Sequence, residues 1–448
     1  MGILDDARAL TEGGPLCDAC LGRVFADRSY GLTNGERGRS LRVAAALEDD
    51  EEPEDVDPAD CWVCEGLCGQ FDEWAERAAA TVEGERSERD ARGSASRGVD
   101  GSEGEAVEFE TYQVGTRTPP LVEENEALLR EMAGLPEDAG EPFKSEFNRE
   151  VGKRVGRLTD TVVDFRRPDV QFVLDIESDT VETEVNSAFV YGRYRKLVRD
   201  IPQTEWPCRE CDGSGRQGRQ PCDHCGGSGY LYEDSVEGLS APVVLDVMDG
   251  VEALFHGAGR EDVDALMLGT GRPFVIEVKE PRRRDVDVDR LEGDINAFAG
   301  GKVEVEGLRL AEHGMVERVK GLDASKTYRA EVEFDADVSE EALSEAVETL
   351  VGATIEQYTP QRVDHRRANL TRTRHVYDAS AERVDDRHAT VEIHGEGGLY
   401  IKELVSGDDG RTEPSLAELL GVSAVVTALD VLAVEGEDEP FERDEFFR

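Results

Sequence analysis

Eight of the nine cysteines form four Cys-x-x-Cys pairs, and this spacing constrains the fold of the chain more than any other feature. One such pair places two sulfur atoms on a tight turn, and two turns complete the tetrahedral ligand set of a zinc ion. No apolar run approaches the roughly 20 residues that span a bilayer, and the N-terminus lacks a basic-then-apolar leader. We therefore expect a cytoplasmic, reducing location, where such pairs bind metal in preference to forming disulfides. The predicted ligands are Cys17, Cys20, Cys61 and Cys64 in one module and Cys208, Cys211, Cys222 and Cys225 in another.

The two cysteine modules differ in how closely their pairs follow each other. Ten residues separate Cys211 from Cys222, and Gly-containing turns follow both pairs. A long acidic segment separates Cys20 from Cys61, but the entropy of closing a loop grows only slowly with its length. We expect structural zinc, because neither set leaves an open position beside a general base. The alternative is reduced thiols without metal, and Cys68 is left over.

The charge of the chain is strongly negative and is spread along its whole length. The 448 residues include 51 basic and 100 acidic side chains, a formal net charge of −49. Such a surface suits a halophilic protein, because carboxylates bind water and the Debye length falls to about 3 Å near 1 M ionic strength. Acidity therefore says little about partners, and nucleic-acid contacts must be sought where the charge is locally reversed.

The length of the chain predicts several domains, because one hydrophobic core rarely serves this many residues. The stretch from Glu76 to Glu105 has almost no large apolar residue and predicts a linker. The region that follows alternates strand-like and helical patterns, which favours an α+β fold. The expected parts are a zinc-binding module at 1–74, a flexible acidic linker at 75–104, an α+β region at 105–200, a zinc-knuckle insert at 201–235 and a large last domain at 236–448.

Local patterns place individual elements in the α+β region. The stretch "VEFETYQVGTR" predicts a strand, and "LVEENEALLREMAGL" predicts an amphipathic helix that ends at Gly134. A second helix is expected in "SEFNREVGKRVGRL". The alternation in "DVQFVLDIESDTVETEVNSAFVYGRYRKL" predicts two strands.

Three basic stretches interrupt the acidic background. "NREVGKRVGR" includes Lys153 and Arg154, and "YGRYRKLVR" interleaves Lys196 and arginines with two tyrosines. The densest stretch, "TPQRVDHRRANLTRTRHV", contains Arg362, Arg366, Arg367, Arg372 and Arg374. Arginines with planar groups between them suit phosphate and base contacts. The alternative for each stretch is an ion-pair face that balances carboxylates elsewhere.

The stretch "HGAGREDVDALMLGTGRPFVIEVKEPRRR" combines two aspartates, a glycine-rich segment and three arginines. An Asp after Gly-Arg is more often a turn former than a nucleophile. The spacing of the residues alone does not show whether Asp262 or Asp264 is the better candidate nucleophile. We expect the glycines of 269–271 to turn the strand back. We expect the arginines of 282–284 to contact phosphate.

Two other segments carry candidate site residues. Alternation in "SKTYRAEVEF" places Tyr328 on the apolar side of a strand, which by itself predicts a core residue. In "GGLYIKELVSGDDGRTEPSLAELLG" the same pattern places Tyr400, Lys402 and Leu404 on one face of a strand, and a short capped helix follows at 414–421. A lysine on such a face needs a carboxylate partner, because burying it unpaired is costly.

Four motifs in order, "GREDVDALMLGTGRPFVIEV", "KTYRAEV", "TPQRVDHRRANLTRTRHV" and "LYIKELVSGDDGRTEPSLAELLG", resemble the archaeal tRNA pseudouridine synthases that isomerise uridines 54 and 55 of the T loop. "CDACLGR", "VGTR", "NREVGKRV" and "IPQTEWPCRECDGSG" are similar to the same family. The resemblance therefore covers nearly the whole chain apart from the linker. It implies a THUMP-type RNA-binding domain in the middle and a pseudouridine synthase domain with a mixed, mainly antiparallel sheet at the end.

The resemblance also implies roles for matching residues. Asp262, which matches the Asp of the Gly-Arg-x-Asp motif, would be the nucleophile, and Lys402 would form an ion pair with it. Tyr328 would lie against the target uracil. The other substrate contacts would come from Arg260, Tyr400 and Leu404. Asp264 does not match the motif and is interpreted as structural.

The residue types suit this chemistry. The target base must be extruded from the folded loop, at a cost of a few kcal/mol, and received on an aromatic face. A nucleophilic carboxylate must stay ionised in a dry pocket, and a neighbouring cation lowers its pKa. No redox step or external group is needed, so we expect no catalytic cofactor. The expected partner is tRNA, bound by a monomer that makes no membrane contact.

Two alternatives remain open. The first is a non-catalytic tRNA-binding or chaperone protein that keeps the fold, for which Asp262 would be dispensable. The second is another THUMP-linked enzyme, such as a methyltransferase or thiolase. That enzyme would need a Gly-rich nucleotide-binding loop that opens a helix, whereas "GTGRP" is followed by a strand-like run.

Overall fold

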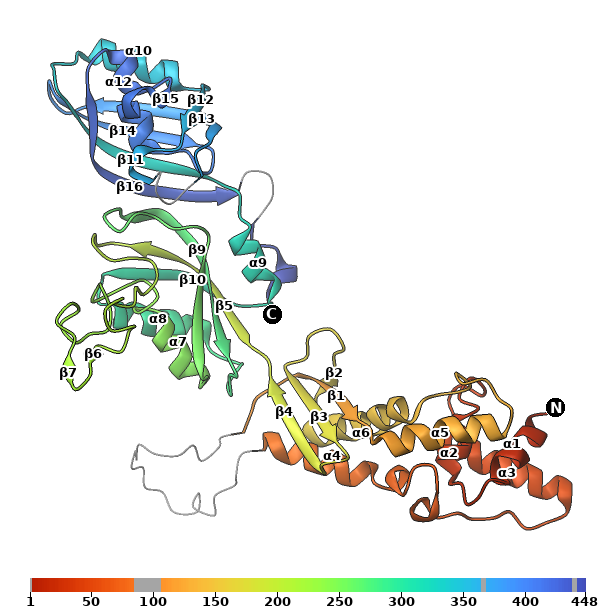
Figure 1. The fold of residues 1–448 in the computed structure, drawn as a ribbon. Helices are drawn as coiled ribbons and strands as arrows, with labels where there is room; N and C mark the ends of the chain where they lie inside the picture. The colour runs from red at the N-terminus through yellow and green to blue at the C-terminus, as the bar shows by residue number, and fades with distance from the viewer. Residues whose placement is uncertain (1, 84–105, 364–367, 437–440) are drawn as a thin grey trace. The chain divides into compact units, whose positions relative to one another are not determined.

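The computed structural model describes residues 2–83, 106–363, 368–436 and 441–448, which form two compact units (Figure 1). Unit 1 contains Met1–Ser187 and Glu280–Arg284, and unit 2 contains Ala188–Lys279 and Asp285–Arg448. Each unit has hydrophobic cores of its own. Among the described residues, we find no helix with the length and apolar character needed to cross a membrane.

The first part of unit 1 is helical. Its elements are α1 (Ile3–Thr11), α2 (Asp18–Arg23), α3 (Asn34–Asp49), the 3-10 turns η1 (Pro58–Asp60) and η2 (Leu67–Gly69), and α4 (Phe71–Val82). Helices α2 and α3 cross closely because glycines stand where they meet. A Cβ atom on Gly22 would lie 1.8 Å from the carbonyl oxygen of Asn34, and one on Gly38 would lie 1.8 Å from that of Asp18. Any larger residue would force the two helices apart.

The second part of unit 1 is a four-stranded sheet of order β2-β1-β3-β4. Its elements are β1 (Thr111–Arg117), α5 (Pro120–Met132), α6 (Phe143–Thr159), β2 (Val162–Val163), β3 (Val170–Asp175) and β4 (Thr180–Val185). The strand and the two helices predicted from the pattern are confirmed. Helix α6 turns Phe143, Phe147, Val151 and Val155, four residues apart, into the core. Phe147 there contacts Phe71 of α4, with ring centroids 5.5 Å apart.

Helix α4 runs through residues that composition placed in the linker. Ala75, Ala78 and Val82 are buried in the core of unit 1. Small apolar side chains at helical spacing are enough to bury this face, so the scarcity of large apolar residues was a misleading signal. The remainder of the expected linker, 84–104, lies outside the described residues.

Unit 2 is built on a ten-stranded sheet of order β10-β5-β9-β16-β11-β14-β13-β12-β15, with β8 also paired to β9. Its strands are β5 (Ala188–Lys196), β8 (Glu252–Gly257), β9 (Met267–Lys279), β10 (Val303–Ala311), β11 (Ala324–Phe334), β12 (Thr354–Tyr358), β13 (Thr371–Arg383), β14 (His388–Gly395), β15 (Thr412–Glu413) and β16 (Ala424–Gly436). The pairings are antiparallel except for β16 with β9, where Val431 faces Met267. The expected mixed, mainly antiparallel sheet of an α+β fold is confirmed.

The helices of unit 2 flank this sheet. They are α7 (Ala241–Met248), α8 (Val288–Ala299), α9 (Gly314–Lys320), α10 (Glu340–Leu350), α11 (Ile401–Ser406) and α12 (Leu416–Leu420), with 3-10 turns η3 (Gln361–Val363), η4 (Asp408–Gly410) and η5 (Asp444–Phe446). Helix α12 confirms the predicted capped helix, with Ser415 as N-cap and Gly421 as C-cap. The hairpin of β6 (Arg216–Gln217) and β7 (Gln220–Pro221) lies between the cysteines of the second module.

The sheet of unit 2 carries two large hydrophobic cores, one over β5, β9 and β10 and one over β11, β13 and β14. Alternation along β11 buries Ala330, Val332 and Phe334, as the pattern predicted. Tyr328, on the same strand, packs against both cores. It therefore lies where the two halves of the unit meet.

The region expected to hold two strands up to residue 200 forms three. Strand β5 pairs with β9 and β10, so it belongs to the sheet of unit 2 and the unit boundary falls at Ser187 instead of residue 200. Only Asn186 and Ser187 separate β4 from β5, and one continuous alternation hid this break from the pattern.

Two further expectations about local structure were wrong. Gly269 and Gly271 do not reverse the chain, because both lie within β9, at a register shift against β5. A Cβ atom on Gly269 would lie 2.0 Å from the carbonyl oxygen of Leu432, so glycine there permits a close strand approach. The hairpin instead joins β8 to β9 through residues 258–266. Lys402 and Leu404 lie on helix α11 and not on a strand, with Tyr400 as its N-cap.

Candidate active site

The loop between β8 and β9 carries both candidate aspartates and turns them in one direction. The Nζ atom of Lys402 lies 3.4 Å from a carboxylate oxygen of Asp262 and 3.4 Å from one of Asp264. Arg362 Nη1 lies 3.7 Å from Asp262. The side chain of Asp262 is 47% exposed and that of Asp264 is 66% exposed. Asp262 thus has two cationic neighbours and the less exposed carboxylate, a distinction that spacing alone did not make.

Helix α11 and the turn η3 position the two cations. Ile401, Leu404 and Val405 of α11 are buried, so the helix is anchored while Lys402 points to the loop. The buried carboxylate of Glu403 accepts a hydrogen bond of 2.7 Å from Arg362 Nε. Burial acts to lower the pKa of Arg362, but the bond to Glu403 and the charge of Asp262 raise it overall. Arg362 is therefore a fixed positive charge.

Two tyrosines lie beside these charges. Burial raises the pKa of Tyr328 to about 12, with Arg272 acting against the shift and Asp262 with it. Its phenol thus keeps its proton at neutral pH. The guanidinium of Arg362 lies over the ring of Tyr400 at 5.9 Å from the centroid. Gln357 fixes the backbone of Tyr400 through two hydrogen bonds of 2.9 Å.

A buried charge cluster lies under the loop and was missed by sequence reasoning. Glu261, next to Asp262, is buried against Arg272 at 2.9 Å and Lys196 at 3.6 Å. Tyr194 donates a hydrogen bond of 2.9 Å to the same carboxylate. The alternation of β5 contained a signal for this cluster, since Lys196 lies on the same face as Val190 and Tyr194. A lysine at an apolar position of a strand predicts a buried partner.

Two of the expected substrate contacts, Leu404 and Arg260, differ in how exposed they are. Leu404 is fully buried in the core over β11, β13 and β14, because α11 turns it away from the loop. It supports the helix and is not accessible to a substrate in this structure. Arg260 is exposed, and its side chain has no ion pair within the described parts of the chain.

Several side chains of the basic stretches contact partners within their own unit. Arg372 donates a hydrogen bond of 3.1 Å to Thr359 Oγ1, and Arg374 lies 3.3 Å from Glu396, the residue after β14. In unit 1, Lys153 pairs with Glu150 and Arg154 pairs with both Asp72 and Glu150. Arg366 and Arg367 lie outside the described residues.

Several other arginines bond to partners within their own unit. Arg193 donates to the carbonyl oxygens of Thr270, Gly271 and Val434. Arg284 is buried and pairs with Asp169 at 3.2 Å. The expected phosphate contact of the 282–284 stretch is therefore wrong for Arg284, whose guanidinium completes the core of unit 1.

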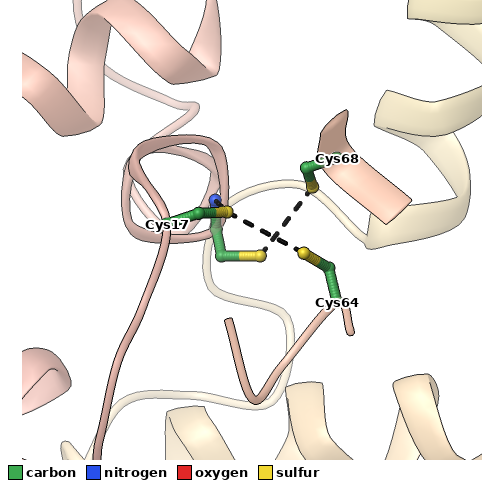
Figure 2. A group of neighbouring side chains, drawn as sticks. Cys17, Cys64 and Cys68 are labelled. Carbon is green, nitrogen blue, oxygen red and sulfur yellow. Dashed lines mark hydrogen bonds between the residues drawn. The ribbon is translucent and has the colours of Figure 1, made fainter. Parts of the chain in front are cut away.

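The first cysteine cluster consists of Cys17, Cys20, Cys64 and Cys68, whose sulfur atoms lie within 4.8 Å of one another. Figure 2 shows Cys17, Cys64 and Cys68 pointing toward one another from separate segments. Cys68 takes the place expected for Cys61, because Gly66 at φ 90° leads into η2 and returns the chain to the cluster. Cys61 is buried nearby but is not one of the four.

The second cluster has the expected composition of Cys208, Cys211, Cys222 and Cys225. Sulfur pairs in the two clusters are separated by 3.8 to 4.0 Å. Zn–S bonds of about 2.3 Å place tetrahedral sulfur atoms about 3.8 Å apart. Both clusters thus fit a tetrahedral metal ion such as zinc.

Comparisons with known proteins agree over both units. A family model described as "Pus10, C-terminal" matches residues 189–435, and one described as "Pus10 THUMP domain, archaeal" matches residues 101–175. A Halorubrum lacusprofundi protein named tRNA pseudouridine synthase Pus10 is 71% identical, with 100% of both chains covered. Proteins of the same name from Methanothrix thermoacetophila and Pyrococcus furiosus are 42% and 38% identical, covering 97% and 96% of this chain and 95% and 98% of their own.

Proposed function

The chain belongs to the Pus10 family of tRNA pseudouridine synthases, and on this premise we propose that it isomerises uridines 54 and 55 in the T loop of tRNA with Asp262 as nucleophile. The observation that carries the assignment is the Asp262 carboxylate held between Lys402 and Arg362 beside Tyr328. Lys402 and Arg362 thus place two positive charges beside this carboxylate, in a site that a flipped base would close to water.

The proposed reaction needs a base that has left its stack. The extruded uracil lies against the ring of Tyr328, which supplies an aromatic face. The Asp262 carboxylate attacks C1′ of the ribose or C6 of the uracil, and the N-glycosidic bond breaks. The base then rotates and C5 bonds to C1′, the bond to Asp262 breaks and returns the free carboxylate, and the proton on C5 is lost to solvent as N1 gains one. Atoms and charge balance without an external donor, so the reaction is an isomerisation.

Lys402 and Arg362 have separate tasks in this scheme. Lys402 contacts both aspartates, so it holds the loop that carries them. Arg362 links Asp262 to the buried Glu403 and to the ring of Tyr400. The exposed Arg260 and the half-buried Tyr400 are proposed to contact the flanking nucleotides. Charge pairing with phosphates is proposed for Arg366, Arg367, Arg372 and Arg374 and, in unit 1, for Lys153 and Arg154.

We also propose that both cysteine clusters bind zinc. Cys17, Cys20, Cys64 and Cys68 would hold one ion, and Cys208, Cys211, Cys222 and Cys225 the other. A zinc ion with four thiolate ligands has no open coordination position, so it stabilises the fold and provides no reactive water. The role of zinc is therefore confined to folding, and the active-site residues act without it.

The test uses unmodified tRNA transcripts and maps pseudouridine with a carbodiimide stop assay. We expect Asp262→Ala to bind tRNA but to form no pseudouridine. Asp264→Ala is the matched control, since it removes the neighbouring carboxylate that also contacts Lys402, and we expect it to retain product formation. Transcripts with cytidine at position 54 or 55 report on each position separately. Equal product from wild type and Asp262→Ala would overturn Asp262 as the nucleophile, whereas no product from wild type would favour the non-catalytic tRNA-binding alternative.

A further inference from the structure

The carboxylate of Glu261, the residue before the candidate nucleophile, has two buried cations beside it, although one would balance its charge. Arg272 Nε donates a hydrogen bond of 2.9 Å to Glu261, and both side chains are buried. This pair is neutral as a unit. Lys196 adds a second buried cation 3.6 Å from the same carboxylate, with none of its side chain exposed. Burying an extra ammonium costs free energy, so the ammonium must have another function or partner.

The other partners of Lys196 are backbone carbonyl groups. Its Nζ donates to the carbonyl oxygens of Ile201 at 3.0 Å, Asp262 at 3.1 Å and Val263 at 3.2 Å. Three donors therefore meet three acceptors, two of which belong to the loop that carries the nucleophile. Hydrogen bonds from a charged donor are stronger than neutral ones, especially away from water.

Neighbouring residues hold the same loop at its ends. Gln203 donates 2.8 Å to the carbonyl oxygen of Gly259, and Arg199 donates 2.8 Å to that of Asp264. The amide of Asp200 donates 3.0 Å to the carbonyl oxygen of Val263. The segment after β5 thus follows the loop from one end to the other. Lys196, the last residue of β5, bonds to the peptide unit of Asp262 itself.

Burial lowers the pKa of Lys196, while the charges of Glu261 and Asp264 act in the opposite direction. Burying the Lys196 ammonium costs free energy, and its hydrogen bonds hold the backbone of Asp262 and Val263. These bonds therefore restrict where the Asp262 carboxylate can lie. Misplacement of a reacting group by about 1 Å can reduce turnover about 100-fold.

We propose that Lys196 is a positioning residue of the active site, which fixes the backbone of Asp262 and Val263 and so aims the Asp262 carboxylate at the flipped nucleotide. The inference rests on the proposed function, because it takes Asp262 as the nucleophile. Lys196 touches neither substrate nor reacting atoms and acts only through the loop.

The experiment compares Lys196→Met, which keeps length and bulk without donors, with wild type in single-turnover and steady-state assays on tRNA transcripts. We expect kcat to fall about 100-fold while KM and the Kd for tRNA stay within about twofold of wild type. Tyr194→Phe is the matched control. It removes the buried hydrogen bonds that the Tyr194 hydroxyl donates to Glu261 and accepts from Gln203, but it leaves the bonds of Lys196 and Gln203 to the loop backbone, so we expect a lower Tm with kcat unchanged.

Each protein is assayed at the same interval below its own Tm, which separates positioning from loss of folded protein. Should Lys196→Met not fold, Lys196→Gln, whose shorter amide cannot reach all three carbonyl groups, is expected to show the same split of kcat from KM. Wild-type kcat in a folded Lys196→Met or Lys196→Gln would overturn the proposal, as would an equal loss in Tyr194→Phe. Asp262→Ala is run in parallel, because activity in that variant would refute the proposed nucleophile instead.

Discussion

The two cysteine clusters present the same four thiols but are held in different ways. The first is continuous with the core of unit 1, which also includes Phe143, Phe147 and the strands β1 and β3. The buried guanidinium of Arg23 lies 3.2 Å from Cys20 Sγ and 3.0 Å from Glu126. The second cluster contains only its own cysteines, surrounded by glycine turns. One site is therefore part of a domain core, and the other is a self-contained knuckle.

This difference decided where sequence spacing was reliable. In the second cluster the four ligands lie within 18 residues, and the turns that bring them together are in the same stretch. Spacing therefore predicted the complete set. In the first cluster the choice between Cys61 and Cys68 depends on η2 and on packing against the rest of unit 1. A Cys-x-x-Cys pattern does not contain that information.

The largest expected effect is the loss of the first metal site. Cys68→Ser removes a ligand of the core cluster, and we expect the full-length protein to retain one of two zinc equivalents. Structural zinc in small domains contributes about 10–16 kcal/mol of binding free energy, which is folding free energy. Unit 1 should therefore lose its cooperative unfolding transition in calorimetry, with metal content measured by mass spectrometry.

Cys61→Ser is the control for this change, because Cys61 is also buried but lies outside the four-sulfur set. We expect two zinc equivalents and a retained unit 1 transition. The opposite result for the two variants would show that Cys61 is the ligand. Loss of zinc in both would point to a five-cysteine site with exchangeable ligands.

The next effect concerns Arg23, whose buried positive charge lies beside the first cysteine cluster. Arg23 is buried between Glu126 and Glu146, so Arg23→Met leaves two buried carboxylates without their shared cation. We expect a loss of about 3–5 kcal/mol in the unfolding free energy of unit 1, measured by denaturant titration. Arg209→Met is the control beside the second cluster, where the arginine is exposed, and it should change stability by no more than about 0.5 kcal/mol. Similar effects in the two variants would remove the contrast between the clusters.

The same contrast applies to the active site and explains what the sequence could predict there. The pairing of Asp262 with Lys402 joins residues 140 positions apart, and the family resemblance was needed to suggest it. Strand alternation placed Tyr328 correctly, because β11 is regular and one of its faces is buried. It failed for residues 400–404, where one helical turn and one strand give similar short patterns.

Charged residues were harder to assign, because the pattern does not report their partners. Arg362 and Lys196 were both placed in basic stretches for which RNA contact and an ion-pair face were both open. In the structure Arg362 contacts Asp262 and Lys196 is buried beneath it. Both assignments depend on which acidic residue the fold brings near, and that is decided by long-range strand pairing.

The smallest expected effect concerns the turns of the second cluster. Gly215 has φ 67°, and a Cβ atom there would lie 2.4 Å from the carbonyl oxygen of Gly227. Gly218 has a similar φ of 66° with nothing within 4 Å of its Cβ position. Both alanine variants carry the backbone strain of about 1–2 kcal/mol, but only Gly215→Ala must also move the opposing turn. We expect zinc affinity of the second site, measured by competition with a chelator, to fall further in Gly215→Ala than in Gly218→Ala, with unit 1 unfolding unchanged in both. Equal affinities would mean that the knuckle adapts freely, and that its separation from a core makes it tolerant as well as easy to predict.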